Sequence, residues 1–373
     1  MRLTDICDFQ GGSQPPKDEW LFEKQEGYIR MLQIRDFTQS EKVVPEYVKI
    51  SKSTKICQAD DILIARYGAS IGKILTGLSG AYNVAIMRAI PDTHMLQKKY
   101  LYYYLKSPYF QTAILNVGSR AAQAGFNKED LSKLEIKCPL LSEQDSIIDI
   151  LQKVESIIGK IKKELIFLDE LVKARFVEMF GDPVHNPYGW NKTELKELAD
   201  LKIGPFGSLL HKEDYIEGGH ALVNPSHIVD GRIIIDSKLT VSEDKYEELS
   251  AYHLKVGDVV MGRRGEMGRC AVVEEEGLLC GTGSLLIRPK GKVTADYIQK
   301  IISYPTFKKT IDDMAVGQTM PNLNVPIVSG FRIITPPIEV QNSYYDFVAQ
   351  VDKSKVISNT KNISKESKIY DWW

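Results

Sequence analysis

The sequence has few cysteines and no long apolar run. Its 373 residues contain five cysteines, none closer than ten positions to the next. This odd, scattered set argues against a disulfide framework and against a Cys-x-x-Cys zinc site. No apolar run approaches the ~18 residues that cross a bilayer, and the N-terminal MRLTDICDFQ lacks the apolar stretch of a signal peptide. We therefore expect a cytoplasmic protein with reduced thiols and no membrane partner.

Neither sign of charge is in excess. The net charge is −1, with 26% charged and 43% hydrophobic residues. This composition is ordinary for a folded globular protein and argues against disorder and against the bulk basicity of a histone-like DNA binder. Lysine and arginine exceed aspartate and glutamate in residues 1–142, whereas the remainder is acidic. Any contact with nucleic acid would therefore depend on local patches.

Motifs for catalysis are also missing. GRRGEMG at 262–268 has the wrong spacing for GxGxxG and no Lys-Ser/Thr pair for a P-loop. The NPSH and NPYG segments at 224–227 and 186–189 only resemble the Asn/Asp-Pro-Pro-aromatic tetrad of amino-methyltransferases. The six histidines show no metal-binding spacing, and no Ser-His-Asp set is supported locally. We expect no catalytic, cofactor or metal site, and place His211, His227 and His253 in loops or at the surface.

The chain contains an internal repeat of about half its length. DILIARYGASIGK at 61–73 matches DVVMGRRGEMGR at 258–269, with an offset of 197 between Arg66 and Arg263. The same offset relates further pairs downstream: Asp61 and Asp258, Gly68 and Gly265, Phe110 and Phe307, Asn127 and Asn324, Leu134 and Phe331, Pro139 and Pro336, Gln144 and Gln341. One offset shared over so long a stretch is hard to obtain by chance and predicts two copies of one domain.

Each copy has the pattern of a mixed α+β domain. A Gly- and Pro-rich loop (11–16; 204–208) precedes short apolar runs bounded by Gly, Asp or Pro, which predict strands. These runs include 43–50, 61–68 and 83–91 in the first copy, and 231–236, 258–264, 271–277 and 284–291 in the second. A helical stretch follows at 98–116 and 295–314, and a strand-like segment ending in Pro follows at 133–140 and 330–338.

A long helix is predicted between the copies. Residues 142–180 contain no Pro and one Gly, and begin with Ser142 as a candidate N-cap. At 1.5 Å per residue this helix would span roughly 55 to 60 Å, too long to be buried in one small domain. Its apolar residues recur at steps of four and three, which is the spacing of a coiled-coil seam. They are Ile147, Leu151, Val154, Ile158, Ile161, Leu165, Leu168 and Val172.

A matching stripe follows the second copy. It comprises Val340, Tyr344, Phe347 and Val351. After Val351 the chain becomes polar and partly β-branched, so we expect the terminal helix to end early, or to be ordered only against the first helix or another protein. Packing within an ordinary bundle is the alternative reading of both stripes. We favour a spacer because the central stripe joins two repeated domains.

Over essentially its whole length the chain resembles the specificity subunits of Type I restriction-modification systems. The resemblance is carried by DILIARYGASIGK and GDVVMGRRGEMGR, by GSRAAQAGFNKEDL (118–131) and GQTMPNLNVPIV (317–328), and by the linker from EMFGDP to GW. It implies an α+β fold of two α/β target recognition domains separated by long antiparallel coiled-coil helices. The domains would span 1–141 and 182–338, and the helices 142–181 and 339–373.

This resemblance implies a non-catalytic DNA-recognition subunit. Each domain would read one half of a bipartite, asymmetric site in double-stranded DNA, while the paired helices fix the gap between the halves. Two methyltransferase subunits would dock on the helices, whose stripe residues are the candidate contacts, and modify an adenine in each half. Restriction subunits would complete the complex.

Candidate DNA contacts lie at the Gly-rich turns and in nearby loops. Glycine lets the backbone approach phosphate, Arg can pair with guanine, and Asn or Gln can pair with adenine. The candidates are Arg35, Arg66, Tyr67, Lys73, Arg120 and Gln123 in the first copy, and Asn224, His227, Arg263, Arg264, Arg269, Gln318, Thr319 and Asn322 in the second. Each arginine has the alternative of being a solvated loop charge. For Asn127 and Asn324 we favour helix capping over base contact.

Two other functions stay open at this point. One is a stand-alone DNA methyltransferase or nuclease with unrecognised motifs. The other is a purely structural coiled-coil scaffold.

Overall fold

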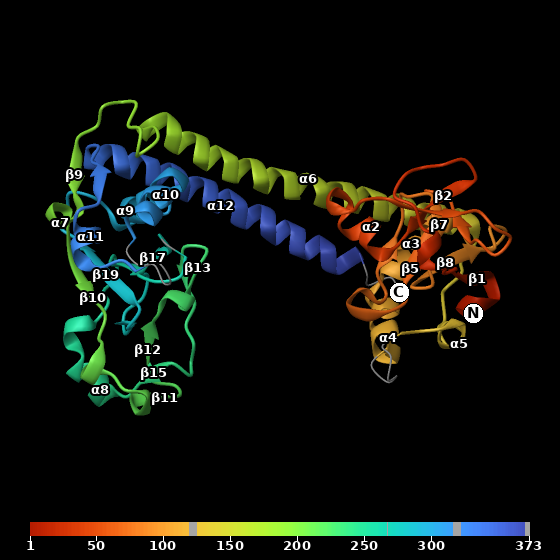
Figure 1. Cartoon of the computed structure of the whole chain (residues 1–373), viewed down its shortest axis with the longest axis horizontal. Coiled ribbons are helices and arrows are strands. Elements are labelled where there is room, and N and C mark those ends of the chain that lie inside the picture. The colour runs from red at the N-terminus through yellow and green to blue at the C-terminus, as the bar shows by residue number, and fades with distance from the viewer. Residues whose placement is uncertain (119–124, 267, 316–321, 370–373) are drawn as a thin grey trace. The chain divides into compact units, whose positions relative to one another are not determined.

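The computed structural model describes residues 1–118, 125–266, 268–315 and 322–369 (Figure 1). The chain divides into two compact units. Unit 1 comprises Met1–Glu164 together with Ile357–Trp373, and unit 2 comprises Leu165–Val356.

Unit 1 contains two four-stranded sheets. The first is antiparallel, in the order β1 (Cys7–Gly11), β8 (Ile86–Pro91), β5 (Ile62–Ala65) and β6 (Ile74–Leu75). The second has the order β3 (Glu46–Lys49), β2 (Tyr28–Leu32), β7 (Gly80–Tyr82) and β4 (Ile56–Cys57), with β2 and β7 parallel. The polar loop between β2 and β3 forms α2 (Ile34–Thr38).

Unit 2 repeats this arrangement. Its antiparallel sheet has the order β10 (Ala199–Ile203), β19 (Ser284–Pro289), β16 (Val259–Gly262) and β17 (Cys270–Val272). Its second sheet has the order β11 (Tyr215–Ile216), β15 (Thr240–Val241), β12 (His220–Val223) and β18 (Leu279–Cys280), again with one parallel pair, β12 and β18. The first sheets have the same strand order and the second sheets the same parallel pairing, which confirms the repeat predicted from the sequence. At the edges where the second sheets differ, an isolated bridge replaces a strand: Leu21 with Tyr47 in unit 1, and His253 with Leu279 in unit 2.

The segments between equivalent strands differ between the units. In unit 2 the chain after β12 forms a hairpin of β13 (Ile228–Val229) and β14 (Arg232–Ile233), followed by β15 and then by α8 (Glu243–Glu248). Asp230 and Gly231 form its two-residue turn with φ of 50° and 76°, as a type I′ turn requires.

Each predicted helical stretch is two helices. In unit 1 they are α3 (Lys98–Lys106) and α4 (Pro108–Gly118); in unit 2 they are α9 (Ala295–Ile302) and α10 (Pro305–Met314). The break falls before a proline in both copies, because proline lacks an N–H and is best placed in a first helical turn.

The closing strand is present in only one of the two predicted places. In unit 2, β20 (Arg332–Ile334) pairs with β9 (Lys192–Glu194). In unit 1 the segment 133–140 makes a single bridge, Arg2 with Glu135. The first helix, α1 (Leu3–Ile6), begins directly after Arg2, so the pairing does not extend beyond the bridge on that side. The strand prediction for 133–140 is therefore wrong.

Two long helices carry the predicted stripes. α6 is continuous over Leu141–Phe180, 40 residues or about 60 Å. It starts before Ser142, which is therefore not the cap; Glu143 instead accepts from the Leu140 N–H at 3.0 Å. α12 runs over Ile338–Ile369, so the expectation that it ends early is wrong. Its polar residues cost little helix propensity each, and no Gly or Pro interrupts it.

Within unit 2, α6 and α12 run antiparallel. The Tyr344 hydroxyl donates to the Val172 carbonyl at 3.3 Å, and Lys355 Nζ lies 2.8 Å from Asp169 Oδ1. Phe176 and Phe180 pack edge-on against Tyr344, with ring centroids 5.5 Å apart in each pair. Offset aromatic contacts of this kind add to the stability of a core. This aromatic cluster joins both helices to the core under the first sheet of the unit.

Two glycines should respond in opposite directions to alanine. A Cβ at Gly204, directly after β10, would lie 1.9 Å from the Gly281 carbonyl oxygen, whereas a Cβ at Gly159 in α6 would meet nothing within 4 Å. Overpacking makes Gly204→Ala destabilising by about 1 to 3 kcal/mol, and helix propensity makes Gly159→Ala stabilising by about 1 kcal/mol. Urea unfolding of both variants measures this; shifts of the same sign would contradict the packing described here.

Candidate nucleic-acid interface

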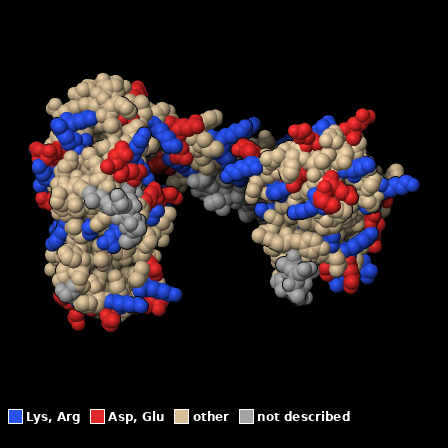
Figure 2. Space-filling view, in the orientation of Figure 1, with Lys and Arg blue, Asp and Glu red and all other residues tan. Residues whose placement is uncertain are grey.

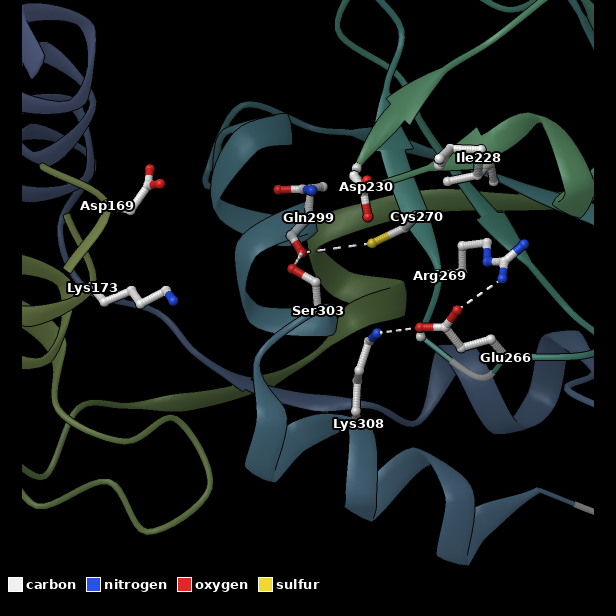
Figure 3. A pocket seen from close by; sticks show the side chains of 13 residues that line it. Asp169, Lys173, Ile228, Asp230, Glu266, Arg269, Cys270, Gln299, Ser303 and Lys308 are labelled. Atoms are coloured by element: carbon white, nitrogen blue, oxygen red, sulfur yellow. Dashed lines mark hydrogen bonds and ion pairs between the residues drawn. The ribbon is translucent and has the colours of Figure 1, made fainter. Parts of the chain in front are cut away.

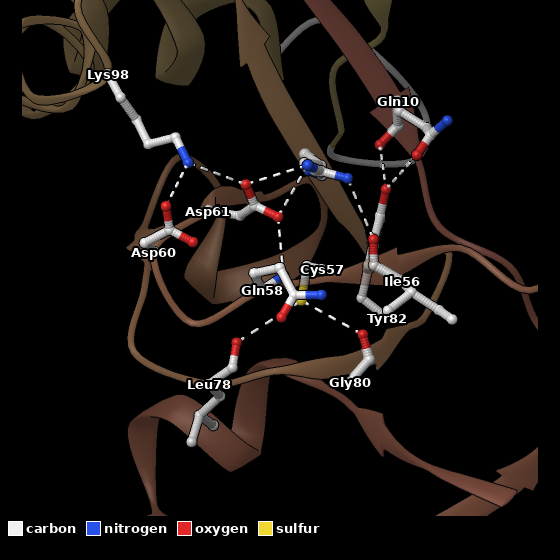
Figure 4. A network of polar contacts seen from close by, with 11 residues as sticks. Gln10, Ile56, Cys57, Gln58, Asp60, Asp61, Leu78, Gly80, Tyr82 and Lys98 are labelled. Atoms are coloured by element: carbon white, nitrogen blue, oxygen red, sulfur yellow. Dashed lines mark hydrogen bonds and ion pairs between the residues drawn. The ribbon is translucent and has the colours of Figure 1, made fainter.

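Both copies contain a Gly-rich turn that follows an arginine, Arg66 or Arg263, and we call it the arginine turn. A buried carboxylate precedes this turn in both copies. Asp61, at the start of β5, has Arg88 Nη2 at 3.0 Å and Lys98 Nζ at 3.3 Å (Figure 4). Asp258, at the start of β16, accepts from Arg288 Nε at 2.8 Å and Nη2 at 2.7 Å. Burying a charge is costly unless it is paired. The aspartate shared by both motifs therefore holds neighbouring elements of its own unit together.

The next shared residue holds a loop. Arg66 follows β5 and donates from Nε to the Phe126 carbonyl at 3.3 Å; Arg263 follows β16 and donates from Nε to the Leu323 carbonyl at 2.8 Å. The acceptors obey the same offset of 197 as the donors. We call this pair of contacts the arginine latch. Because the latch uses Nε, the outer nitrogens can make further contacts, and Arg66 Nη1 donates to the Val84 carbonyl at 3.3 Å.

The turn after each latch needs glycine. Gly68 and Gly265 have φ of 69° and 79°, in the left-handed region that favours glycine. Next to them, Tyr67 forms a β-bridge with Gly125, and Arg264 forms one with Asn322. The turns thus lie beside the chain that flanks 119–124 and 316–321. The candidate contacts Arg120, Gln123, Gln318 and Thr319 lie outside the described residues.

Exposed candidates surround these turns. Tyr67, Lys73 and Arg264 are exposed, whereas Arg66 and Arg263 are half-buried. The Arg66 guanidinium lies 4.9 Å from the centroid of the Tyr67 ring. Partial burial, and then the charge of Arg264, lower the pKa of Arg263. Neighbouring cations disfavour each other's charge, and a bound phosphate would relieve this.

Three candidate DNA contacts either lie away from the turns or already have partners within the protein. Arg35 is exposed and forms an ion pair with Glu46. Asn224 is the N-cap residue of a short 3-10 turn, Pro225–His227. His227 is buried, with Nδ1 2.8 Å from the Leu222 carbonyl oxygen. His227 thus lies in a connecting turn, as expected, but it is buried and not at the surface, because its ring is hydrogen-bonded to the backbone of β12.

The capping prediction is confirmed. Asn127 Oδ1 accepts from the Asp130 N–H at 3.1 Å, at the start of α5 (Lys128–Leu131). Asn324 Oδ1 accepts from the Ile327 N–H at 2.9 Å, at the start of α11 (Val325–Ser329). Asn322, by contrast, is half-buried, and its Oδ1 has no hydrogen-bond partner among the described residues.

A polar cavity of about 830 Å³ adjoins the second turn (Figure 3). Arg269 Nη2 and Lys308 Nζ, from the turn and from α10, each lie 2.8 Å from Glu266. The hydrogen bonds from Lys308 and then Arg269 lower the pKa of Glu266 to about 2. Lys173 of α6 and Asp230 of the β13–β14 hairpin also line the cavity.

Lys173 and Lys308 were not among the residues predicted from the sequence. Both come from helices far from the turn in the chain, and Lys308 stands where the first copy has Gln111. A local motif therefore carried no signal for them.

The predicted helix stripes pack within each unit. In unit 1, Ile147, Leu151, Val154 and Ile158 belong to or contact the core; in unit 2, Val172, Val340 and Tyr344 do so. Of the others, Ile161 and Val351 are buried, and Leu165, Leu168 and Phe347 are half-buried.

A second set of α6 residues was missed by the sequence analysis. It is apolar and exposed, and comprises Ile150, Ile157, Ile166, Phe167, Leu171 and Val177. Phe167 is 64% exposed and Leu171 47%. Their spacing is a weaker signal than the heptad stripe, which is why the stripe alone was singled out.

The cysteine side chains form no pairs with one another. All five cysteines are unpaired, and burial raises the pKa of Cys270 and Cys280 to about 12. Over the described ranges, no cluster of three or more His, Cys, Asp and Glu side chains is placed to hold a metal. Within those ranges no helix is both long and apolar enough to span a bilayer.

These features define a duplicated domain with a latched arginine turn, and the comparisons give its class. Residues 1–166 and 187–366 match the family described as Type I restriction modification DNA specificity domain. The chain belongs to this family.

Individual relatives agree with this assignment. The Type I restriction enzyme MjaVIII specificity subunit of Methanocaldococcus jannaschii is 22% identical over 394 residues, covering 99% of this chain and 88% of that protein. A chain from a structure of the type I R-M system, described for complex assembly and conformational transition, has a TM-score of 0.64 at 15% identity, covering 99% of this chain and 95% of its own. The Type-I restriction-modification system S subunit from M. genitalium has a TM-score of 0.52 at 14% identity, covering 99% and 93%. The two structures share the fold.

Removing the carboxylate of Glu266 should change stability in a pH-dependent way. The pKa of Glu266 is lowered from 4.5 to about 2, so its ion pairs stabilise the fold above the unfolded pKa and are lost as pH falls toward 2. Glu266→Gln should therefore be less stable than the parent at neutral pH, by a small margin because the site is exposed, and equal to it at strongly acid pH. Urea unfolding at low salt measures the difference, with the exposed Glu217→Gln as control. A gap that does not change with pH would contradict this assignment.

Proposed function

We propose that this chain is the DNA-recognition subunit of a Type I restriction-modification complex and that each unit reads one half of a bipartite, asymmetric site. The observation that supports this most is the repeated latch. In both copies the arginine of the turn donates from Nε to a backbone carbonyl at the same offset, and a buried aspartate at the start of the preceding strand pairs with an arginine of the neighbouring strand. A shared scaffold with divergent loops allows two similar domains to recognise two different half-sites on one DNA duplex.

The divergence lies where a reader would need it. Unit 1 has α2 between β2 and β3, whereas unit 2 has the β13–β14 hairpin between β12 and β15 and then α8. The segments after the equivalent strands β2 and β12 differ in length and in secondary structure. Base contacts specify sequence and phosphate contacts position the protein, so the shared turns fit phosphate contact and the divergent segments fit base contact.

Positive charge in this protein is local. Figure 2 shows basic and acidic side chains interspersed on the visible face of each unit, in keeping with the net charge of −1. Tyr67 and Lys73 in unit 1, and Arg264 and Arg269 in unit 2, are the side chains we assign to DNA. His227, because it is buried, is not among them. Affinity that comes from a few such cations falls steeply as salt rises.

The exposed apolar residues of α6 indicate where the partner subunits bind. We assign the methyltransferase subunits, two per complex, to the apolar residues that include Phe167 and Leu171, because exposed apolar patches mark interaction sites. Restriction subunits then join that complex. In this assignment the chain itself supplies recognition and leaves methyl transfer and cleavage to its partners, in the cytoplasm where the cell's DNA lies.

The DNA assignment is tested by sequencing modified adenines in the host genome and using the motif found as a duplex probe. The chain with its methyltransferase subunits should prefer this duplex in gel shifts. Arg264→Ala should weaken binding and reduce the salt slope by about 1 if the residue contacts phosphate. Lys196→Ala is the matched control, since Lys196 precedes Ala199 at the opposite end of the sheet from Gly262. No preference for any duplex would sink the assignment.

The partner assignment is tested on α6. Phe167→Ser with Leu171→Ser should abolish co-elution with the methyltransferase subunits, while stability changes by roughly 0.5 kcal/mol or less per site because both side chains are exposed. Leu140→Ser, 73% exposed just before α6, is the control. An intact complex from the double variant would contradict this docking surface.

A further inference from the structure

Two glutamines lie fully buried at the base of the long helices. Gln144 is in the first turn of α6 and Gln341 in the first turn of α12, and both are 0% exposed. They are related by the offset of 197. Glutamine is mostly an exposed residue, so its burial at the same place in both copies requires a reason.

Each amide joins three segments of its own unit. Gln144 Oε1 accepts from the Gln97 N–H at 2.9 Å, and its Nε2 donates to the carbonyls of Met95 at 2.7 Å and Pro139 at 2.9 Å. The first two partners lie at the start of α3. The third precedes α6.

The second copy makes the same set of bonds. Gln341 Oε1 accepts from the Thr294 N–H at 3.1 Å, and its Nε2 donates to the carbonyls of Pro336 at 2.9 Å and Lys292 at 3.5 Å. Lys292 and Thr294 lie at the start of α9, and Pro336 precedes α12. We call each set of three bonds a glutamine joint.

The glutamine joint constrains the angle between each long helix and its own domain. Apolar packing between a helix and a domain is non-directional. Hydrogen bonds weaken steeply away from linearity, and three of them in different directions hold one geometry. Loss of the amide would also leave a buried N–H and two carbonyls short of a partner. The direction in which each long helix leaves its domain therefore depends on this residue.

We propose that Gln144 and Gln341 are positioning residues that set which spacing between the two half-sites the protein accepts. This rests on the proposed function above. A domain of this size has a radius of gyration of about 14 Å, so a tilt of only about 7° at the joint moves its far side by about one base-pair rise of ~3.4 Å. Small angular freedom at a joint thus becomes tolerance of a neighbouring spacer length.

The two joints are not equally reinforced. In unit 1 the Gln97 side chain adds bonds from Nε2 to the Leu141 carbonyl at 3.1 Å and to Asp145 Oδ1 at 2.6 Å. In unit 2 the side chain of Thr294 is used instead to cap α9, accepting from the Tyr297 N–H at 3.1 Å. The second joint depends more on its single glutamine, and Gln341 variants should have the larger effect.

The test is a methylation map. The chain is expressed with its methyltransferase subunits in cells that lack adenine methylation, and modified sites are sequenced. Gln144→Met and Gln341→Met keep the side-chain length without the amide, and Gln152→Met and Gln350→Met are controls at exposed positions on the same helices. The joint variants should keep both half-site sequences but modify spacers one base pair longer or shorter at least about tenfold more often than the parent.

Other results of the methylation map would distinguish failure of the proposed function from failure of the proposed role of the glutamines. If the parent modifies no bipartite motif, the proposed function fails. If the parent does so and the joint variants keep its single spacer, the role of the glutamines is overturned; a change in the half-site sequences would overturn it too. Thermal unfolding checks that the variants fold. Should they not, Gln97→Ala, which removes only the two reinforcing bonds, must show a weaker relaxation of the same kind.

Discussion

The arginine turns depend on a carboxylate that is withdrawn from water. Asp61 and Asp258 each tie the strand that leads into the turn to an arginine of the neighbouring strand, Arg88 or Arg288. Without a paired cation such a buried charge would not persist. The pair therefore holds the start of the strand in place, and the latch holds the loop beside the turn at the strand's other end.

Sequence patterns were sufficient to predict the features that depend on interactions between residues close together in the chain. The repeat, the central helix, most of the predicted strands and the Asn127 and Asn324 caps follow from spacing and from turn chemistry, and the structure has them. The splitting of the helical stretches could have been read from Pro108 and Pro305. The length of α12 was underestimated because a weak propensity was treated as a stop.

What could not be predicted depends on distant contacts. The pairing of Glu266 with Lys308 joins a turn to a helix some forty residues away in the chain, and the burial of His227 depends on how β12 packs. The heptad stripe of α6 packs against residues of the two units themselves. The apolar residues of α6 outside the stripe that remain exposed, such as Phe167, could therefore be identified only from the packing. For the arginines, the sequence indicated position but not the use of Nε for a carbonyl.

The latch has a consequence for how such a gene can change. Its donors and acceptors, like the buried ion pair and the glutamine amides, begin and end within one copy. A crossover between the two halves of the gene, or with another gene of the same layout, would transfer a complete reading module and cut none of these bonds. New combinations of half-sites could therefore arise by recombination without a period in which the protein is unstable.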